Sequence, residues 1–477
     1  MELKGKRACP TAGVSMSGRR VTVIGLGNSG VNAALLLSKH GAKVFATDSG
    51  MNAELERSKA KLEARKINVE LGAHTEAFVK GSDLVVLSPG VEDSSQALKW
   101  ALEHKIKIIG EMELGYLFCK GRIIAITGTN GKSTVTTLIG EILKDSGKDT
   151  VVCGNIGNSL CGEIAKIKKD TWVVLEVSSA QLEHVEKFKP HIAIILNVTD
   201  DHMDRYRSFY EYFNHKLKIF ANQDRDDLLI LNYDAENLRN LKGLAGSNVL
   251  FYARERLAAN SYEIAAYVRD EWICCICGEG EKEIMHLNEI KLKGLHNLEN
   301  VIVSSLVGMI ACATERSIRD TVRKFTGLAH RFETVDVVEG VEYIDDSKST
   351  TVDSTKRALE SCSKPVVLIA GGKDKHSDYS AVKNSVEDKA RHVVLIGEAA
   401  GAIKKALVAN TIIHEAGDMD EAVEMSSKLA KDGWAVLLSP MCSSFDMYKN
   451  YKERGDKFKE AVGKLKAAVK TGGGLSK

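Results

Sequence analysis

A glycine-rich turn that ends in Lys-Ser-Thr is the strongest chemical signal in the sequence. Residues Arg122–Thr127 read as a strand, Gly128–Thr134 as a loop, and the following residues as a helix. Small residues in such a turn let backbone N–H groups point at phosphate oxygens, and the helix N-terminus adds positive potential. Lys132 would reach the β- and γ-phosphates of a nucleotide, and Ser133 would offer a hydroxyl to Mg²⁺. The pattern indicates ATP binding rather than a turn without a ligand, although Ile126 stands where the usual motif has its first glycine.

A second glycine motif lies near the N-terminus. Gly25, Gly27 and Gly30 form a G-x-G-x-x-G pattern. It follows the strand-like run Arg20–Ile24, and Asp48 ends the next such run, which is typical of nucleotide binding with the acid at a ribose. The residues alone leave three interpretations open: tight helix–strand packing without a ligand, a dinucleotide, or another nucleotide diphosphate. The phosphate loop downstream makes a redox cofactor less natural.

Polar side chains also follow two later strand-like runs. Glu176 lies at the end of the run that starts at Trp172, and His202 follows the run His191–Asn197. Open α/β sheets bind their ligands at the carboxyl ends of the strands. Glu176 is therefore a candidate Mg²⁺ ligand, and His202 a candidate second metal ligand or substrate contact. A solvated loop residue is the alternative for each.

The elements expected along the chain alternate between strands and helices, which favours parallel α/β sheets. At about 100 to 200 residues per domain, 477 residues suggest about three domains. We expect an N-terminal Rossmann-like domain over residues 1–119 and a central ATPase domain of the P-loop type, with a parallel sheet, over 120–327. A C-terminal Rossmann-like α/β domain is expected over 328–477. Short β-type runs without helical periodicity occupy residues 250–293.

Composition excludes several classes of protein. Hydrophobic residues make up 44% of the chain and charged residues 27%, which excludes disordered and fibrous chains. The 66 basic and 64 acidic residues are interspersed, so we expect no nucleic-acid partner. No apolar run is long enough to span a bilayer, and the N-terminus lacks the apolar region of a secretory signal. We therefore expect no membrane association and a cytoplasmic protein, which we take to be a monomer.

The ten cysteines are scattered along the chain, which favours reduced thiols over a disulfide framework. Cys274 and Cys277 form a single C-x-x-C pair, which also contains Cys275 and follows Trp272 and Ile273. Because there is no second pair, the sequence favours a buried strand over a zinc or redox centre.

Short motifs in a fixed order extend from Gly25 to about Lys457. They are Gly25–Gly30, Ser88–Gly90, Gly110–Leu114, Thr127–Thr134, Gly154–Gly157, Glu176–Ser179, Leu196–Tyr206, Leu295–Asn300, His330–Arg331, Asp346–Thr350 and Ser439–Ser444. With these motifs the sequence resembles the Mur ligases of peptidoglycan synthesis. The glycine loop of the first domain then reads as a binding site for uridine diphosphate.

The resemblance implies an ATP-dependent amide ligase that adds D-glutamate to UDP-N-acetylmuramoyl-L-alanine. In this family the carboxylate of the sugar-peptide attacks the γ-phosphate of ATP, which gives ADP and an acyl phosphate. The amine of the amino acid then displaces phosphate through a tetrahedral intermediate. D-glutamate is favoured because related lysine- and diaminopimelate-adding enzymes carry an Asn-Pro-Arg signature not found here, and alanine-adding enzymes have His in place of Asn130. Folylpolyglutamate synthetases, which are also related, lack a first domain with a glycine loop.

The resemblance also assigns residues to catalysis, to metal ions and to ATP. Catalysis is assigned to Lys132, Glu176, His202 and Lys216. Two Mg²⁺ ions are assigned to Ser133 and Glu176 and to His202 and Lys216, with Lys216 carbamylated so that it becomes a carboxylate-like ligand. By its type alone Lys216 would read as a surface lysine of a helix. ATP would lie between the second and third domains, at Gly128, Thr129, Asn130, Gly131, Lys132, Ser133, Thr134, Asn297, Asn300, Arg331 and Asp346. Within this set the resemblance places Asn297 and Asn300 at the adenine, Arg331 at the γ-phosphate and Asp346 at the ribose.

The two other substrates are assigned in the same way. UDP and the muramoyl-peptide would be held by Gly25, Gly27, Asn28, Ser29, Gly30, Asp48, Ser88, Asn155, Gln181 and His202. D-glutamate would be held by Lys348, Thr350, Lys375, Ser444, Phe445 and Tyr451. Lys373 is a rival for Lys375, and Thr351 stands where the family often has Asn.

Two hypotheses from other classes remain beside the ligase. A nucleotide-driven switch or motor would turn over ATP without a carboxylate acceptor, and it leaves the first glycine loop unexplained. A dinucleotide-dependent oxidoreductase or a nucleotide-sensing module would bind its cofactor at Gly25–Gly30, and it leaves Lys132 and Ser133 without a role.

Overall fold

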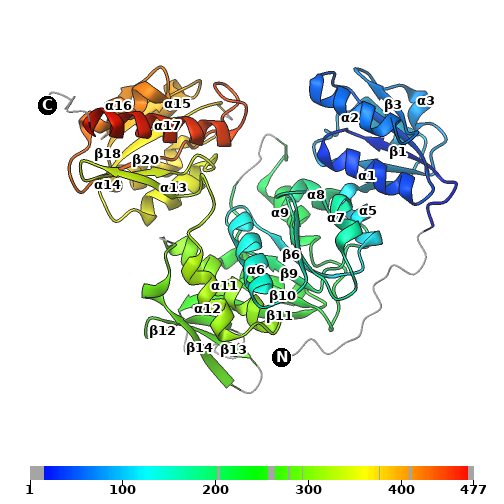
Figure 1. The fold of residues 1–477 in the computed structure, drawn as a ribbon, viewed down its shortest axis with the longest axis horizontal. Helices are drawn as coiled ribbons and strands as arrows, with labels where there is room; N and C mark the ends of the chain where they lie inside the picture. Colours follow the sequence, from blue (N-terminus) through cyan, green and yellow to red (C-terminus); the bar gives the residue numbers. More distant parts are fainter. Residues whose placement is uncertain are drawn as a thin grey trace. The chain divides into compact units, whose positions relative to one another are not determined.

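The computed structural model describes residues 15–200, 205–255, 264–277, 280–292, 294–374, 377–407 and 411–470. These residues fall into two compact units. The first unit comprises Met1–Val198, Tyr206–Glu289 and Glu299–Arg323, and the second comprises Thr199–Arg205, Ile290–Leu298 and Lys324–Lys477. The first unit holds two sheets and the second holds one, and helices flank each sheet (Figure 1).

The first sheet has five parallel strands in the order β3-β2-β1-β4-β5. Its inner strands are apolar on both faces, as expected where helices cover a parallel sheet, and Val21, Val23, Val85 and Val86 are fully buried. The strand order reverses beside β1, so the glycine loop opens where such sheets bind ligands. The elements are β1 (Arg20–Ile24), α1 (Asn28–Lys39), β2 (Lys43–Asp48), α2 (Ala53–Glu63), β3 (Asn68–Leu71), α3 (Glu76–Val79), β4 (Leu84–Leu87), α4 (Gln96–Glu103), β5 (Ile108–Gly110) and α5 (Glu111–Phe118).

The second sheet has nine strands in the order β14-β13-β12-β11-β10-β9-β6-β8-β7. Neighbours from β7 to β12 pair in parallel, and β12, β13 and β14 form an antiparallel edge. Strand β6 lies between β8 and β9, so the loop after β6 is flanked by two other strand ends. The strands are β6 (Arg122–Thr127), β7 (Thr150–Gly154), β8 (Trp172–Glu176), β9 (Ile192–Ile195), β10 (Leu228–Asn232), β11 (Asn248–Glu255), β12 (Ile264–Arg269), β13 (Trp272–Cys277) and β14 (Gly280–His286).

The helices around the second sheet bring polar residues to its carboxyl edge. Helix α9 begins after Ser208, whose hydroxyl accepts a hydrogen bond from the backbone N–H of Glu211. Tyr212 and Lys216 are four residues apart on this helix and share its buried face. The helices are α6 (Lys132–Asp145), α7 (Leu160–Glu163), α8 (Ser179–Glu183), α9 (Phe209–Leu217), α10 (Glu236–Arg239), α11 (Leu295–Ile310) and α12 (Glu315–Lys324).

The sheet of the second unit has six strands in the order β15-β16-β20-β17-β18-β19. Only the edge strand β15 runs antiparallel to its neighbour, and the other pairs are parallel. The elements are β15 (Glu333–Val338), β16 (Val341–Asp345), α13 (Val352–Ser361), β17 (Val366–Gly371), α14 (Lys383–Lys389), β18 (Ala390–Ile396), α15 (Ala400–Leu407), β19 (Ile412–Glu415), α16 (Met419–Leu429), β20 (Ala435–Leu438) and α17 (Tyr451–Lys470).

The predicted α/β fold class with mostly parallel sheets is confirmed. The β-type runs expected over residues 250–293 form β11 to β14, and Cys274 and Cys275 are fully buried on β13, as predicted. The Cys277 side chain lies outside the described residues. Sequence reasoning missed the strands β3, β7, β15 and β19, whose burial patterns are only partial. None of the described helices combines the length and apolar character that crossing a bilayer requires.

Candidate active site

The phosphate loop follows β6 and leads directly into α6. Thr127 is fully buried at the strand end, and Gly131 adopts the left-handed conformation, with φ of 83°, immediately before the helix. A Cβ atom on Gly131 would lie 2.6 Å from Oδ1 of Asn300, so glycine is required here and Asn300 lies against the loop. The structure therefore brings together two elements that the sequence assigned to ATP.

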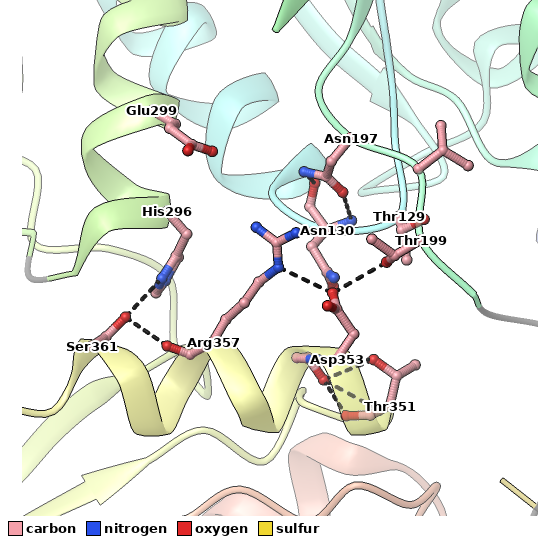
Figure 2. Close-up of polar contacts among 12 residues, drawn as sticks. Thr129, Asn130, Asn197, Thr199, His296, Glu299, Thr351, Asp353, Arg357 and Ser361 are labelled. Carbon is pink, nitrogen blue, oxygen red and sulfur yellow. Dashed lines mark hydrogen bonds and ion pairs between the residues drawn. The ribbon is translucent and has the colours of Figure 1, made fainter. Parts of the chain in front are cut away.

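Asn197, which follows β9, holds the loop in shape. Its backbone oxygen accepts from the N–H of Thr129 at 2.9 Å, and its side-chain Oδ1 accepts from the N–H of Asn130 at 2.9 Å. Its Nδ2 donates back to the Asn130 oxygen at 3.2 Å. Figure 2 shows Asn197 facing Asn130 in this exchange. The loop is thus preorganised by a neighbouring strand end.

Two lysine amino groups meet at one carbonyl oxygen of the loop. Lys132 Nζ donates to the backbone oxygens of Gly128 and Thr129, at 2.8 and 2.7 Å. Lys216 Nζ donates to the same Gly128 oxygen at 2.9 Å and lies 4.5 Å from the centre of the Tyr212 ring. The Lys216 side chain is 1% exposed, so its interpretation as a surface lysine is wrong.

A buried carboxylate lies at the end of the strand next to β6. Glu176 is 2% exposed, and its position in the sheet register faces Ile126, two residues before the loop. Its Oε1 accepts from Nδ2 of Asn155 at 2.9 Å, whereas its Oε2 is buried without a hydrogen-bond partner among the residues that the structure describes. Such an oxygen needs a partner, and a divalent cation fits it. Ser133 is buried at the start of α6, and His202 lies outside the described residues.

The first glycine loop is built by close backbone contact. A Cβ on Gly30 would lie 1.8 Å from the Gly25 oxygen, which shows the tight packing that one interpretation of the motif expected. Both carboxylate oxygens of Asp48 accept backbone N–H groups, Oδ2 from Leu26 at 2.7 Å and Oδ1 from Gly50 at 2.8 Å. Asp48 therefore shapes the loop itself, and the exposed edge of the loop at residues 27 and 28 is what a ligand could reach.

Some of the other residues assigned to the UDP-sugar are exposed, and others form hydrogen bonds within the fold. Asn28 Nδ2 donates to Oδ1 of Asn158 at 3.2 Å, which joins the first loop to the segment after β7. Ser88 is half-buried beside the end of β4. Gln181 is 5% exposed, and its Oε1 accepts from the backbone N–H of Ser178 at 3.0 Å as part of the cap of α8.

In the second unit, the residue assigned to the ribose of ATP is fully engaged in hydrogen bonds. Asp346 Oδ2 accepts from the hydroxyls of Ser349 and Ser439, at 2.5 and 3.0 Å, and Oδ1 accepts from the backbone N–H of Phe332 at 3.1 Å. Burial disfavours its charged form and raises the pKa of Asp346 to about 7, although the hydrogen bonds act in the opposite direction. Asp346 thus ties together the strand ends that surround it.

We expect stability to depend on pH through Asp346. Its pKa rises from 3.8 to about 7 on folding, so between these values the folded protein holds a proton that the unfolded chain has released. Stability therefore falls as pH rises through this window. Asp346→Asn cannot ionise and should gain about 2 to 3 kcal/mol relative to the wild type between pH 5 and 7.5. Urea denaturation of both proteins at both pH values tests this, and a difference that does not change with pH contradicts it.

Arg331, assigned to the γ-phosphate, lies in a turn with an unusual backbone. Both neighbours have left-handed conformations, with φ of 63° at His330 and 49° at Phe332. The turn is held because His330 Nδ1 lies 2.7 Å from Oδ2 of the fully buried Asp345, and the His330 oxygen accepts from the N–H of Lys348 at 3.0 Å. One hydrogen-bonded turn therefore carries the arginine and contacts the segment assigned to D-glutamate.

Replacing Gly455 with alanine should destabilise the protein by about 1 to 3 kcal/mol. An added Cβ would lie 2.2 Å from His330 Nδ1 and 2.7 Å from Asp345 Oδ2, so the pair would have to separate. Gly463→Ala is the matched control on the same helix, because a Cβ there meets open space, and it should stabilise the helix by about 0.5 to 1 kcal/mol. Thermal unfolding measures both changes, and equal midpoints for the two variants would rule out the close contact.

The residues assigned to D-glutamate come from three described segments of the second unit. Lys348 Nζ lies 4.2 Å from the centre of the Tyr451 ring, so these two assigned residues are in contact. Ser444 is 2% exposed and Phe445 is 72% exposed. Thr350 is half-buried, and Thr351 caps α13. Lys375 lies outside the described residues, and its rival Lys373 forms an ion pair with Glu398 at 2.6 Å.

The first turn of α13 and the first turn of α11 carry further polar contacts in the second unit. Figure 2 shows Asp353 accepting from Thr199 Oγ1 at 3.1 Å and from Arg357 Nε at 3.0 Å. His296 Nδ1 lies 3.0 Å from Ser361 Oγ, which also donates to the Arg357 oxygen at 2.7 Å. Burial, with a smaller effect from Arg357, lowers the pKa of His296 to about 4, so this histidine is neutral near pH 7. Of the two assigned adenine contacts, Asn297 belongs to the second unit and Asn300 to the first.

Sequence reasoning missed three residues that shape these sites. Asn197 was seen only as part of a motif, although it clamps the phosphate loop. Tyr212 contacts Thr129 through their hydroxyls at 3.1 Å, and its spacing from Lys216 on one helix face was a usable signal. Arg454 is fully buried on α17, where an arginine within an apolar stripe could have been noticed.

Three family models match successive parts of the chain. Residues 19–110 match the MurD-like N-terminal domain of Mur ligases, residues 126–308 the Mur ligase middle domain, and residues 330–442 the glutamate ligase domain of Mur ligases. A UDP-N-acetylmuramoylalanine–D-glutamate ligase of Koribacter versatilis is 42% identical over 452 residues, which cover 95% of this chain and 99% of the relative. A protein of the same name from Thermoanaerobacter sp. is 38% identical over 457 residues, covering 95% of this chain and all of the relative.

A solved structure shows the same fold at lower sequence identity. The pseudomurein peptide ligase type C from Methanothermus fervidus has a TM-score of 0.59 and 18% identity, and the match covers 94% of this chain and 100% of that chain. The family resemblance seen in the sequence is confirmed, and the chain belongs to the Mur ligase family.

Proposed function

We propose that this chain is an ATP-dependent amide ligase that joins D-glutamate to UDP-N-acetylmuramoyl-L-alanine and releases ADP and phosphate. The observation that carries the proposal is a phosphate loop with Lys132 over it, next to the strand end with the buried Glu176, one oxygen of which has no partner within the described part of the chain. This combination fits phosphoryl transfer, where positioning and charge neutralisation do most of the work. The named relatives, which match along 95% of the chain, support the choice of acceptor and amino acid.

The chemistry runs in two balanced steps. A carboxylate oxygen of the muramoyl-L-alanine group attacks the γ-phosphorus of ATP, the bond to the bridging oxygen breaks, and ADP leaves. The amine of D-glutamate then attacks the acyl carbon, phosphate leaves, and the nitrogen loses a proton. In the first step Lys132 would exchange its two loop carbonyl acceptors for phosphate oxygens, since an ammonium group binds a charged oxygen more strongly than a carbonyl oxygen.

The residues assigned to Mg²⁺ fit a hard cation. Glu176 offers a buried oxygen without a partner in the described residues, and Asn155 fixes the other carboxylate oxygen. When bound, Mg²⁺ supplies positive charge at the phosphate oxygens. We propose Ser133, Glu176, His202 and Lys216 as the residues that hold two ions.

Carbamylation of Lys216 belongs to this proposal. The amino groups of Lys132 and Lys216 both donate to the Gly128 oxygen. If Lys216 is unmodified, the two positive charges repel each other there. Reaction of the neutral Lys216 amine with CO₂ forms an N–C bond and releases a proton, and the resulting carboxylate would attract Lys132 instead. The buried position beside Tyr212 would protect such a group from water.

We also propose the binding residues and boundaries assigned from the sequence. UDP is placed at the exposed edge of the first glycine loop, and D-glutamate beside Lys348, Ser444 and Tyr451. The boundaries after residues 119 and 327 are supported by the residue ranges that match three successive family domains. We also propose that the protein is a monomer and acts in the cytoplasm, where nucleotides and free amino acids are available.

The mass of the product tests the proposed function. Incubation with ATP, Mg²⁺, UDP-N-acetylmuramoyl-L-alanine and D-glutamate should give one new nucleotide whose mass is the sum of acceptor and D-glutamate minus water. Omission of ATP should abolish it. ATP hydrolysis without any such product would reject the ligase and favour a nucleotide-driven switch.

A further inference from the structure

Arg454 is the largest fully buried side chain in the described part of the molecule. Its guanidinium group donates four hydrogen bonds within the second unit. Nε donates to Ser347 Oγ at 3.0 Å and Nη2 to the Ser347 backbone oxygen at 2.8 Å. Nη2 also donates to the Cys442 oxygen at 3.1 Å, and Nη1 donates to the Ser443 oxygen at 3.2 Å. One side chain therefore joins two loops that are almost a hundred residues apart in the sequence.

These acceptors are the immediate neighbours of residues assigned to D-glutamate. Ser347 precedes Lys348, and Ser443 precedes Ser444. A shift of either acceptor would move the adjacent side chain, because neighbouring residues share a rigid peptide plane. Arg454 therefore bonds to the residue directly before Lys348 and to the residue directly before Ser444, both of which are assigned to D-glutamate.

Two further segments of the same predicted pocket meet this guanidinium group. The Ser347 hydroxyl that accepts from Arg454 donates in turn to the backbone oxygen of Tyr451 at 2.8 Å, at the start of α17. A Cβ on Gly372 would lie 3.0 Å from Nη1 of Arg454. Gly372 opens the segment that leads to Lys375. The three described segments with residues assigned to D-glutamate therefore meet at Arg454, and Gly372 packs against it.

Burying the charged guanidinium group of Arg454 is unfavourable, so its hydrogen-bonding geometry must compensate. The hydrogen bonds that it makes among the described residues go only to neutral oxygens, and the carboxylates of Asp446 and Asp345 act on its charge without bonding to it. Burying a charge without a directly bonded charged partner is unfavourable. Burial lowers the pKa of Arg454 to about 10, and the group stays protonated at neutral pH. The first turn of a helix, where Arg454 lies, is also the end that disfavours a cation. A rigid planar fork with donors in several directions is what arginine offers and lysine does not.

We propose that Arg454 is a positioning residue for the amino-acid substrate: its guanidinium fixes the three described segments so that the side chains of Lys348, Ser444 and Tyr451 converge on one dicarboxylate. Arg454 is fully buried and acts through the backbone of Ser347, Cys442 and Ser443. The proposal rests on the proposed function, and it adds the residue that sets the geometry of the D-glutamate pocket.

Arg454→Lys tests the proposal, because lysine keeps the charge and loses the fork. We expect KM for D-glutamate to rise about tenfold or more, since misplacement by about 1 Å can cost a factor of this order. KM for ATP and for UDP-N-acetylmuramoyl-L-alanine should stay within about twofold. Steady-state kinetics with each substrate varied in turn gives the three values.

Phe458→Leu is the matched control. Phe458 lies one turn further along α17, is fully buried in the core, and makes no contact assigned to substrate. It should lower the thermal midpoint and leave KM for D-glutamate unchanged. An equal rise in this KM for both variants would show a general effect of destabilising α17 and would overturn the proposal.

Ser347→Ala keeps the test decisive if Arg454→Lys does not fold. This smaller change removes one acceptor of the guanidinium, and we expect a selective rise of about threefold in KM for D-glutamate. A folded Arg454→Lys with KM for D-glutamate within twofold of the wild type would overturn the proposal, as would a parallel rise in all three KM values. A wild-type protein without D-glutamate-dependent turnover would instead reject the proposed function.

Discussion

Replacing Lys132 with methionine should lower the rate of ADP formation by about a thousandfold or more. The Lys132 amino group lies over the phosphate loop, 2.8 and 2.7 Å from two carbonyl oxygens that a phosphate group would replace as its partners. Methionine has similar length without charge, so the variant should lose the group that neutralises the transferred phosphate, while Asn197 still holds the loop. A single-turnover assay with ATP, Mg²⁺ and UDP-N-acetylmuramoyl-L-alanine, without D-glutamate, measures this step alone.

The control for this variant lies on the same helix. Lys144 is exposed in the last turn of α6, and Lys144→Met should change the rate by less than about twofold. Undiminished ADP formation by Lys132→Met would show that the assigned role is wrong.

Replacing Lys216 with methionine should lower turnover by about a hundredfold to a thousandfold. The expected cause is loss of a carboxylate-like metal ligand, since the Lys216 side chain is buried and directed at the carbonyl of Gly128. Wild-type protein equilibrated with ¹³C-bicarbonate should show a carbamate signal by ¹³C NMR that is absent from Lys216→Met.

A second lysine of the same region decides how this signal is assigned. Lys218 lies two residues further along, and its pKa is lowered by burial, so it is the natural competitor for CO₂. Lys218→Met should keep the carbamate signal. Loss of the signal in Lys218→Met, or its persistence in Lys216→Met, would contradict the assignment to Lys216.

The parts of the fold that the sequence predicts are those where local pattern and burial agree. Strands β1 and β6 were predicted with their observed ends, because each is a short run rich in β-branched residues that ends at a glycine, which is typical of a buried strand in a parallel sheet. Strands β3 and β19 have mixed exposure and few residues, so their pattern resembles that of loops. The α/β class follows from the alternation of elements and does not depend on these details.

The parts of the site that escape the sequence depend on contacts between distant residues. Gly128–Thr134 reveals a phosphate loop, but nothing local shows that Asn197 clamps it or that Lys216 reaches the same carbonyl. The resemblance indicated a role for Lys216, and only the fold shows that this residue is buried. Nothing local distinguishes Arg454 from other arginines, because its acceptors lie in two loops that only the fold brings together. The substrate and metal roles assigned to the site residues stay predictions, and His202 and Lys375 also lie outside the described residues.

The most direct test of the account is phosphate release with ATP, Mg²⁺ and UDP-N-acetylmuramoyl-L-alanine, with D-glutamate, L-glutamate, L-lysine or L-alanine added in separate reactions. Only the nucleophile differs among them. We predict release that depends on D-glutamate and is absent with the other three. Release with a different amine would contradict the assigned pocket, and equal release with or without any amine would contradict the ligase itself.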